Sequence, residues 1–318
     1  MNWKQLLPKS AYSSFKRARL LKRAVVRPCL TLLLRLGWPR TLAEYLGSRR
    51  FHGRVFLYRQ GILSVAASDR FVRFATEQRP MDKLHREYSM WRLLREHGLE
   101  RIVVRTMTFQ ACANGKVLET DLLRPVPREE QVAVTMPIVH ALMAAAKPTV
   151  HKGMPATVEA GLQLARVIAE GALPSSFASE AEIRNSFAQE LMTGISHRDI
   201  HSRNIMRDVD GRPVLIDLKS CEVNRVVSLD LIIFACKYRQ VRRLENLVES
   251  AFLLQQQGWR VTELEPVLDL VDLPRPFWAQ IFVLHFMGLQ ALKLDSLDNV
   301  NPLFRKLFFR ILSRNWHG

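Results

Sequence analysis

The sequence has few cysteines and lacks any long hydrophobic run. Its four cysteines form no CxxC pair and lie far apart, at Cys29, Cys112, Cys221 and Cys236. This spacing gives poor support for a zinc site or a disulfide framework, so free thiols in a reducing cytoplasm are expected. The most hydrophobic stretch, Cys29–Trp38, is interrupted by Arg35 and is too short to cross a membrane. The first 20 residues lack the apolar region and cleavage site of a signal peptide, so we expect the protein on the cytosolic side.

Positive charge is the feature that the sequence has in excess. The chain has 318 residues, of which 48% are hydrophobic and 24% charged, as in globular proteins. Its length allows one two-lobed unit or two domains. The formal net charge is +17, and residues 1–50 contain twelve Lys and Arg residues against one acidic residue, Glu44. Most of the excess charge therefore belongs to the amino-terminal segment.

Two segments near the ends of the chain are basic and amphipathic. Residues 10–27 place apolar side chains at helical spacing, with Lys and Arg mostly elsewhere around the helix, and Pro28 ends the pattern. A second helix is expected from Pro302, with Phe304, Leu307, Phe308 and Ile311 on one face. Such helices suit an anionic membrane surface, although solvated helices packed on their own domain are the alternative. Nucleic-acid binding is not favoured, because no recognised binding motif accompanies the charge.

The residues that indicate a chemical function lie in Gly194–Cys221. Asn204 follows Asp199 by five residues, and Asp217 comes at the end of the apolar run Val214–Ile216. Transfer of a γ-phosphoryl group requires a residue that orients or deprotonates the attacking hydroxyl, together with oxygen ligands for Mg²⁺. We assign the first role to Asp199 and the second to Asn204 and Asp217.

A predicted hairpin explains how these residues can meet. Residues 205–207 and 213–216 are expected to form two strands joined by a turn that contains Gly211. This hairpin would return Asp217 to the neighbourhood of Asn204. Asp199, Asn204 and Asp217 could also be ordinary turn or helix-cap residues. However, a match to the phosphoryl-transfer spacing at this many positions is poorly explained by coincidence.

At Ser196–Asp199 and Leu215–Lys219 the sequence resembles the protein-kinase-like superfamily. It is most similar there to the bacterial lipopolysaccharide core kinases, which phosphorylate heptose or Kdo. The resemblance implies an α+β, two-lobed fold, with a small β-rich lobe before a large helical lobe. It also implies that His197 and Arg198 support the catalytic loop and that Asp230 braces it.

The sequence departs from protein kinases after Asp217. The motif here is Asp-Leu-Lys instead of Asp-Phe-Gly, and no Ala-Pro-Glu follows. Only Leu218–Leu229 separates Asp217 from the next expected helix. This short segment favours a small-molecule or glycolipid acceptor over a peptide. Lys219, two residues after Asp217, is a candidate contact for phosphate or for an anionic acceptor, and a solvated lysine is the alternative.

The first part of the chain has the pattern of a small lobe. Strands are expected over residues 54–59, 62–67, 71–75, 102–108 and 116–122, and a helix over Asp82–His97 that ends at Gly98. Asn114 and Gly115 predict a hairpin turn between the last two strands. The glycines here do not have GxGxxG spacing, so the phosphate-covering loop has no assigned position.

Arg73 and Glu87 are the candidate phosphate-orienting pair of this lobe. In the kinase arrangement, a helix glutamate pairs with a strand cation that holds the α and β phosphates. Glu87 lies on the expected helix, and Arg73 takes the strand position that is usually Lys. Lys83 is the alternative cation. A surface ion pair, or two separate solvated charges, would be the non-functional interpretation.

The rest of the chain is expected to be helical. Helices are predicted over residues 131–150, 157–170, 181–192, 231–236, 241–257, 263–271 and 276–294, with Ser228 or Asp230 capping the fourth. His140, His151 and His201 are candidate acid or base groups, but single histidines are more often solvent-exposed or core residues.

We therefore expect three segments: a basic segment at 1–45, a small lobe at 46–122 and a large helical lobe at 123–318. The expected function is transfer of phosphate from ATP, with Mg²⁺, to a sugar hydroxyl of a membrane glycolipid such as the lipopolysaccharide core. The protein would be cytoplasmic and peripheral on the inner face of the cytoplasmic membrane. The alternatives are an inactive pseudokinase scaffold in envelope assembly and a soluble kinase of the antibiotic or choline type.

Overall fold

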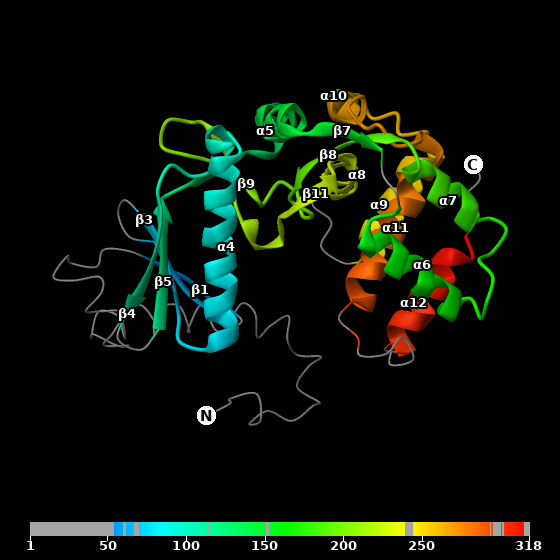
Figure 1. Cartoon of the computed structure of the whole chain (residues 1–318), viewed down its shortest axis with the longest axis horizontal. Coiled ribbons are helices and arrows are strands. Elements are labelled where there is room, and N and C mark those ends of the chain that lie inside the picture. Colours follow the sequence, from blue (N-terminus) through cyan, green and yellow to red (C-terminus); the bar gives the residue numbers. More distant parts are fainter. Residues whose placement is uncertain are drawn as a thin grey trace. The chain divides into compact units, whose positions relative to one another are not determined.

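The computed structural model describes residues 54–59, 62–66, 70–112, 115–150, 153–238, 244–292, 294, 300 and 302–314 (Figure 1). The helix expected over residues 10–27 lies outside the described residues. The chain divides into two compact units, Met1–Ser89 with Val104–Leu123 and Met90–Val103 with Arg124–Gly318. The second unit therefore includes a short piece of chain that lies, in sequence, between parts of the first.

A five-stranded antiparallel sheet forms the first unit. Its strands are β1 (Arg54–Arg59), β2 (Ile62–Ala66), β3 (Arg70–Ala75), β4 (Met107–Cys112) and β5 (Gly115–Asp121), in the spatial order β1-β2-β3-β5-β4. Val65, Val72 and Val117 are completely buried on the central strands β2, β3 and β5. The strands expected from the sequence are confirmed apart from the first half of the fourth.

The strand predicted over residues 102–108 begins only at Met107. Before it, Glu100–Ile102 form a short 3-10 helix, η4. Three backbone carbonyl groups of the segment from 100 to 103 accept hydrogen bonds from the guanidinium group of Arg212, at 3.0 to 3.2 Å. Because a side chain satisfies these carbonyls, the segment needs no neighbouring strand.

Helix α4 (Gln78–Glu96) follows β3 and begins four residues earlier than the predicted helix at Asp82. It ends before Gly98, whose φ of 73° is a left-handed conformation that glycine adopts without strain. Tyr88 of α4 stacks on Phe109 of β4, with ring centroids 5.9 Å apart. This contact helps to hold the start of the helix against the sheet of the first unit.

The second unit is mostly helical. Its longer helices are α5 (Gln131–Ala145), α6 (Ala156–Ile168), α7 (Glu180–Phe187), α8 (Ser228–Lys237), α9 (Leu244–Gln256), α11 (Trp278–Ala291) and α12 (Pro302–Leu312). Short helical segments are η5 (Arg128–Glu130), η6 (Leu218–Ser220), η7 (Thr262–Leu264), α10 (Glu265–Leu268) and η8 (Arg275–Phe277). A sheet unit and a helical unit confirm the predicted α+β class.

Two small antiparallel sheets accompany the helices. One has the order β10-β9-β6 and the other β11-β8-β7. Their strands are β6 (Arg124–Pro125), β7 (Lys147–Val150), β8 (Glu190–Ser196), β9 (Ile205–Arg207), β10 (Pro213–Leu215) and β11 (Glu222–Val226). The chain enters and leaves the Gly194–Cys221 motif through these strands.

Two predicted helices are wrong at their carboxyl ends. The helix predicted over 131–150 stops at Ala145, and residues 147–150 form β7. The helix predicted over 181–192 stops at Phe187, and residues 190–196 form β8, which pairs with β7 and β11. Gly194 and its β-branched neighbours, Thr193 and Ile195, are poor helix formers. A Cβ atom on Gly194 would lie 3.0 Å from the Cα of Ala146, so glycine lets the two segments approach closely. The strand pairing of two distant segments therefore overrides the helical periodicity.

Several other predictions differ only at their ends. The helices expected over 157–170, 241–257 and 276–294 form as α6, α9 and α11. The helix expected over 263–271 is shorter, because η7 and α10 cover only part of it. Among the described residues, Cys112, Cys221 and Cys236 form no disulfide bond.

Helices α6 and α11 cross at two glycines. A Cβ atom on Gly161 would lie 1.9 Å from the carbonyl oxygen of Leu284, and one on Gly288 would lie 1.6 Å from that of Thr157. Such distances are far below van der Waals contact, so only glycine allows the two backbones to approach this closely. Near the crossing, Thr157 Oγ1 and His285 Nδ1 are 2.8 Å apart and link the helices through a buried hydrogen bond.

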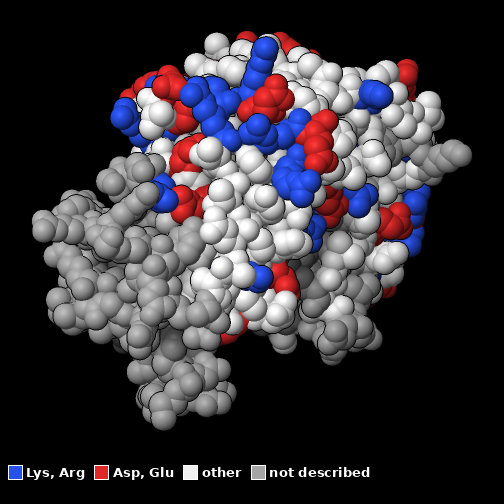
Figure 2. Space-filling view, turned by 60° about the vertical axis from the view of Figure 1, so that its left-hand side comes forward, with Lys and Arg blue, Asp and Glu red and all other residues white. Residues whose placement is uncertain are grey.

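The apolar face of α12 belongs to the core of its own unit. Phe308, Ile311 and Leu312 are buried, whereas Lys306 and Arg310 are exposed. The predicted amphipathic pattern is therefore confirmed, but its apolar face is already covered by protein. On the face shown in Figure 2, Lys and Arg side chains lie among Asp and Glu side chains.

Candidate active site

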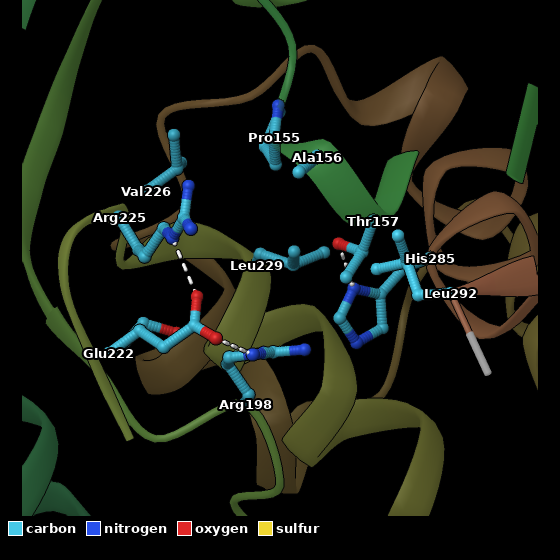
Figure 3. Close-up of a pocket in the computed structure, with 11 residues that line it drawn as sticks. Pro155, Ala156, Thr157, Arg198, Glu222, Arg225, Val226, Leu229, His285 and Leu292 are labelled. Atoms are coloured by element: carbon cyan, nitrogen blue, oxygen red, sulfur yellow. Dashed lines mark hydrogen bonds and ion pairs between the residues drawn. The ribbon is translucent and has the colours of Figure 1, made fainter. Parts of the chain in front are cut away.

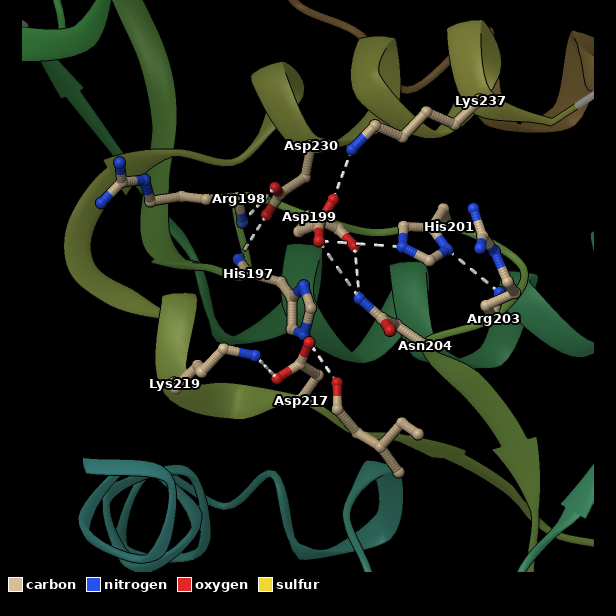
Figure 4. A network of polar contacts seen from close by, with 11 residues as sticks. His197, Arg198, Asp199, His201, Arg203, Asn204, Asp217, Lys219, Asp230 and Lys237 are labelled. Carbon is tan, nitrogen blue, oxygen red and sulfur yellow. Dashed lines mark hydrogen bonds and ion pairs between the residues drawn. The ribbon is translucent and has the colours of Figure 1, made fainter. Parts of the chain in front are cut away.

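Asp230 of α8 holds the loop that follows β8. Its two carboxylate oxygens accept hydrogen bonds from the backbone N–H groups of His197 and Arg198, each at 2.6 Å (Figure 4). Arg198 has a φ of 63°, which is uncommon for a residue other than glycine, so these bonds stabilise a strained turn. Burial raises the pKa of Asp230 to about 6, and the two N–H donors offset part of this rise.

Neither residue expected to cap α8 does so. Asp230 contacts the loop instead, and Ser228 Oγ bonds to the Asp272 carboxylate. The bracing role that the resemblance implied for Asp230 therefore corresponds to an observed pair of hydrogen bonds.

His197 connects this loop to the strand that precedes Asp217. Its Nε2 lies 2.9 Å from the carbonyl oxygen of Ile216 and therefore carries the proton of this hydrogen bond. The side chain is completely buried, and burial lowers the pKa of the ring, which is therefore neutral. His197 thus contributes to the architecture of the loop.

Asp199 lies between one cation and one imidazole. The ammonium group of Lys237, at the end of α8, contacts its Oδ1, and His201 Nε2 lies 3.7 Å from its Oδ2. Burial raises the pKa of Asp199, but His201 and the Lys237 charge lower it by more, so the pKa lies below its ordinary value. Asp199 is therefore ionised at neutral pH.

Lys237 contacts the candidate base Asp199, and the sequence did not predict this contact. The only signal in the sequence is a single lysine at the end of the otherwise apolar Leu231–Cys236. A basic residue in the last turn of a helix is common because it interacts with the helix dipole. Its pairing with Asp199 depends on tertiary structure.

Asn204 and Asp217 are brought together by the predicted hairpin. Strands β9 and β10 pair from Ile205 with Leu215 to Arg207 with Pro213, and the backbone N–H of Ile216 donates to the Asn204 carbonyl at 2.9 Å. Gly211 in the turn has the expected positive φ, 81°. The hairpin expected from the sequence is confirmed, and it sets Asp217 beside Asn204.

The side chains of this group are oriented by further contacts. Asn204 Nδ2 donates to the Asp199 backbone carbonyl at 3.0 Å and lies 3.5 Å from its Oδ2. Its carboxamide oxygen is therefore the atom left for a cation. Asp217 has a left-handed φ of 63°, and the Lys219 ammonium contacts its Oδ1. A carboxylate and a carboxamide oxygen are the types of ligand that Mg²⁺ prefers.

In the first unit, Arg73 and Glu87 form a bidentate ion pair. Arg73 Nη1 and Nη2 donate to the two Glu87 carboxylate oxygens at 2.8 and 2.7 Å. Glu87 is only 3% exposed, so this pair is not a solvated surface contact. Lys83 lies on α4 itself, and Arg73 is the cation that the structure places on Glu87.

The predicted site residues thus form two groups. Asp199, Asn204, Asp217 and Lys219 lie together in the second unit, whereas Arg73 and Glu87 lie in the first. Of the histidines considered, His201 contacts Asp199, His140 is exposed, and His151 is outside the described residues. Across the part of the chain that the structure describes, no group of three or more His, Cys, Asp and Glu residues could hold a metal.

No helix among the described residues is both long enough and apolar enough to span a membrane.

Residues 62–262 match the model of the APH family, described as a phosphotransferase enzyme family. No curated protein is significantly similar to the chain in sequence.

Three solved structures are similar to the chain. A structure of aminoglycoside 2′-phosphotransferase-IIIa with GDP is similar at 10% identity, over 89% of this chain and 98% of that chain, with a TM-score of 0.51. Choline kinase LicA from Streptococcus pneumoniae is similar at 14% identity, over 86% and 97%, with a TM-score of 0.45. An aminoglycoside phosphotransferase from Streptomyces rimosus is similar at 14% identity, over 80% and 97%, with a TM-score of 0.48.

The family match covers more than half of the chain and confirms the kinase-like part of the predicted resemblance. The aminoglycoside 2′-phosphotransferase-IIIa structure shares the fold. The chain therefore belongs to the APH phosphotransferase family and is an ATP-dependent kinase that transfers phosphate to an alcohol group.

Proposed function

We propose that the protein transfers the γ-phosphoryl group of ATP to a sugar hydroxyl of a membrane glycolipid, with the lipopolysaccharide core as the acceptor. The observation that supports a transfer site here is the arrangement of Asp199, Asn204 and Asp217 in one hydrogen-bonded loop and hairpin. Phosphoryl transfer depends mainly on positioning and charge, and these three side chains provide both.

Asp199 is the proposed base. Its ionised carboxylate accepts the proton of the attacking hydroxyl as the new bond from oxygen to phosphorus forms and the bond to ADP breaks. Lys237 holds Oδ1 and Asn204 contacts Oδ2, so the carboxylate has a fixed orientation.

Asn204 and Asp217 are the proposed ligands of Mg²⁺, and Arg73 with Glu87 is the proposed phosphate-orienting pair. A bound Mg²⁺ would neutralise charge on the phosphate oxygens. The Asn204 carboxamide oxygen and the Asp217 carboxylate are the ligands that this chain supplies. Lys219 beside Asp217 adds a positive charge for phosphate.

The short connection after Asp217 supports a non-peptide acceptor. Only η6 and β11 lie between Asp217 and α8, so there is little chain for docking a peptide. The resemblance of Ser196–Asp199 and Leu215–Lys219 to heptose and Kdo kinases supports a sugar of the lipopolysaccharide core. A soluble small-molecule acceptor is the second candidate, favoured by the family match.

The basic segment at residues 1–45 is proposed to hold the protein at an anionic membrane on the cytoplasmic side. Its excess of Lys and Arg supports this role. The exposed Lys306 and Arg310 of α12 would add charge, whereas the apolar face of that helix is used in the core.

Transfer from labelled ATP to a panel of acceptors tests the function. The panel contains extracted core glycolipid, choline and an aminoglycoside, each with Mg²⁺. We expect label in the glycolipid well above that in the two soluble compounds. Strong labelling of choline or the aminoglycoside, with none in the glycolipid, would make the soluble small-molecule kinase the correct assignment.

A further inference from the structure

A small cavity of ≈ 100 Å³ lies in the second unit beside the catalytic loop (Figure 3). Its volume is roughly that of three water molecules at about 30 Å³ each, which suits a phosphate or carboxylate group but not a whole sugar. The walls come from the start of α6, the loop after β8, strand β11, and helices α8 and α11. None of the proposed base or metal-ligand residues lines it.

Two arginines bring positive charge to the cavity. Arg198 contacts one oxygen of Glu222, and Arg225 Nε donates to the other at 2.8 Å. The three side chains therefore carry a net charge of +1. The Arg225 side chain is 42% exposed, and the Arg198 side chain is 19% exposed. Arg225 thus stands nearer the solvent and Arg198 deeper in the protein.

The start of α6 adds a partial positive charge. Pro155 and Ala156 line the cavity at this end, and no side chain caps the helix. Val158 N–H already donates to the Pro155 carbonyl at 2.8 Å, so the backbone N–H groups of Ala156 and Thr157 are the donors that this 13-residue helix without a side-chain cap offers to an anion.

His285 provides an independent indication that the cavity can bind a polar group. Its side chain is 1% exposed, and its Nε2 has no hydrogen-bond partner among the described residues. Nδ1 is occupied by Thr157 Oγ1, and Figure 3 shows the second ring nitrogen on the side away from Thr157, toward Arg198. A buried polar atom without a partner is costly, so a bound group that accepts from Nε2 would stabilise this arrangement.

The protonation state of His285 fits an anion. Burial, with the charges of Arg198 and Lys237, lowers its pKa to about 3, so the ring is neutral. When Thr157 Oγ1–H donates to Nδ1, the single ring proton is on Nε2 and is available to an oxyanion.

We propose that this cavity is an oxyanion-binding site for a phosphate or carboxylate group. The anion is held by Arg198, Arg225, the His285 Nε2–H and the start of α6. Glu222 opposes it, because its carboxylate occupies donors of both arginines. Anion binding does not require that the proposed glycolipid be the acceptor.

Binding of inorganic phosphate to the full-length protein, measured by calorimetry, tests the site. A saturating non-hydrolysable ATP analogue keeps phosphate out of the nucleotide site. We expect one binding event that is weakened about tenfold in Arg225→Gln, as for loss of a charge-assisted contact. Glu222→Gln removes the opposing carboxylate and is expected to bind phosphate more tightly. Arg260→Gln, an exposed arginine outside the cavity, is the matched control and should bind as wild type.

The proposal is overturned if wild type does not bind phosphate, or if Arg225→Gln binds it as well as wild type. Circular dichroism of each variant separates loss of binding from loss of folding. Once an acceptor is identified, the effect of phosphate on the rate of transfer shows where the anion comes from. Competition between phosphate and acceptor assigns the site to an anionic group of the acceptor, whereas activation by phosphate assigns it to a free anion.

Discussion

At the scale of single residues, the contact between Asp199 and Lys237 explains how the candidate base is held. The ammonium group fixes one carboxylate oxygen, and together with His201 it keeps the pKa of Asp199 below its ordinary value, so the carboxylate is ionised and can accept a hydrogen bond from the attacking hydroxyl. The lowered pKa also makes Asp199 a weaker base. A weaker base is sufficient for a loose phosphoryl-transfer transition state, because orientation of the hydroxyl matters more there than proton abstraction.

The assignments of Arg73 and of Lys83 as the phosphate-orienting cation predict different effects of substitution on ATP binding. If Arg73 orients the phosphates, Arg73→Lys should weaken ATP binding about tenfold, because lysine cannot keep both hydrogen bonds to Glu87. Lys83→Gln should leave the affinity for ATP unchanged. Fluorescence titration of an ATP analogue measures both, and a loss of affinity in Lys83→Gln alone would transfer the role to Lys83.

At the scale of elements, the loop that carries the candidate base depends on α8. Asp230 is the first acidic residue of that helix, and its buried carboxylate accepts two backbone N–H groups of a strained turn. The loop and the helix are 32 to 33 residues apart in sequence, so their contact is part of the tertiary structure.

Asp230 should also shape the pH dependence of stability. Its pKa is raised from 3.8 to about 6 in the folded chain, so its stabilising contribution is complete below pH 3.8 and is lost as pH rises through 6. Between about pH 4 and pH 7, wild type should lose on the order of 3 kcal/mol of unfolding free energy relative to Asp230→Asn. Urea unfolding across this range measures the difference.

Asp269→Asn, at a side chain that is 72% exposed, is the control for this measurement and should follow wild type. Parallel curves for wild type and Asp230→Asn would show that the Asp230 carboxyl titrates as an ordinary exposed group.

The crossing of α6 and α11 should tolerate no side chain at Gly161. Gly161→Ala places a Cβ 1.9 Å from a backbone oxygen of the facing helix, so the helices must separate. We expect a loss of about 3 kcal/mol in unfolding free energy. Gly153→Ala, where a Cβ would enter open space, should change stability little. Equal stability of the two variants would contradict the close packing.

Local sequence signals predicted the hairpin of Asn204 and Asp217, because its two strands and its glycine turn are adjacent in the chain. They failed at β7 and β8, which pair across about 40 residues of intervening chain. Lys237 was missed for the same reason. Asp230 was found only through the resemblance, since its hydrogen bonds to His197 and Arg198 have no local signature.

At the scale of the whole molecule, charge is unevenly distributed along the chain. The first 50 residues carry much of the net +17, whereas charges of both signs are mixed on the described face in Figure 2. An electrostatic attraction to a membrane would therefore come chiefly from the amino-terminal segment.

Sedimentation with anionic vesicles tests this attraction. Glutamine replaces the basic residues of the predicted helix, Lys16, Arg17, Arg19, Lys22, Arg23 and Arg27, in the full-length chain. We expect wild type to bind at low salt and to be released as salt rises, and the glutamine variant to remain in solution. Lys306→Gln with Arg310→Gln, the matched change on α12, should have a smaller effect. If the first variant binds vesicles as well as wild type does, the amino-terminal segment does not attract the protein to the membrane.

The rate of phosphate transfer from ATP to extracted core glycolipid by Asp199→Asn tests most directly whether Asp199 is the base. We expect kcat to fall about a thousandfold, because the candidate base is lost, while the affinity for ATP stays close to that of wild type. Asp269→Asn should keep the wild-type rate. Transfer by Asp199→Asn at the wild-type rate would contradict the assignment of Asp199 as the base.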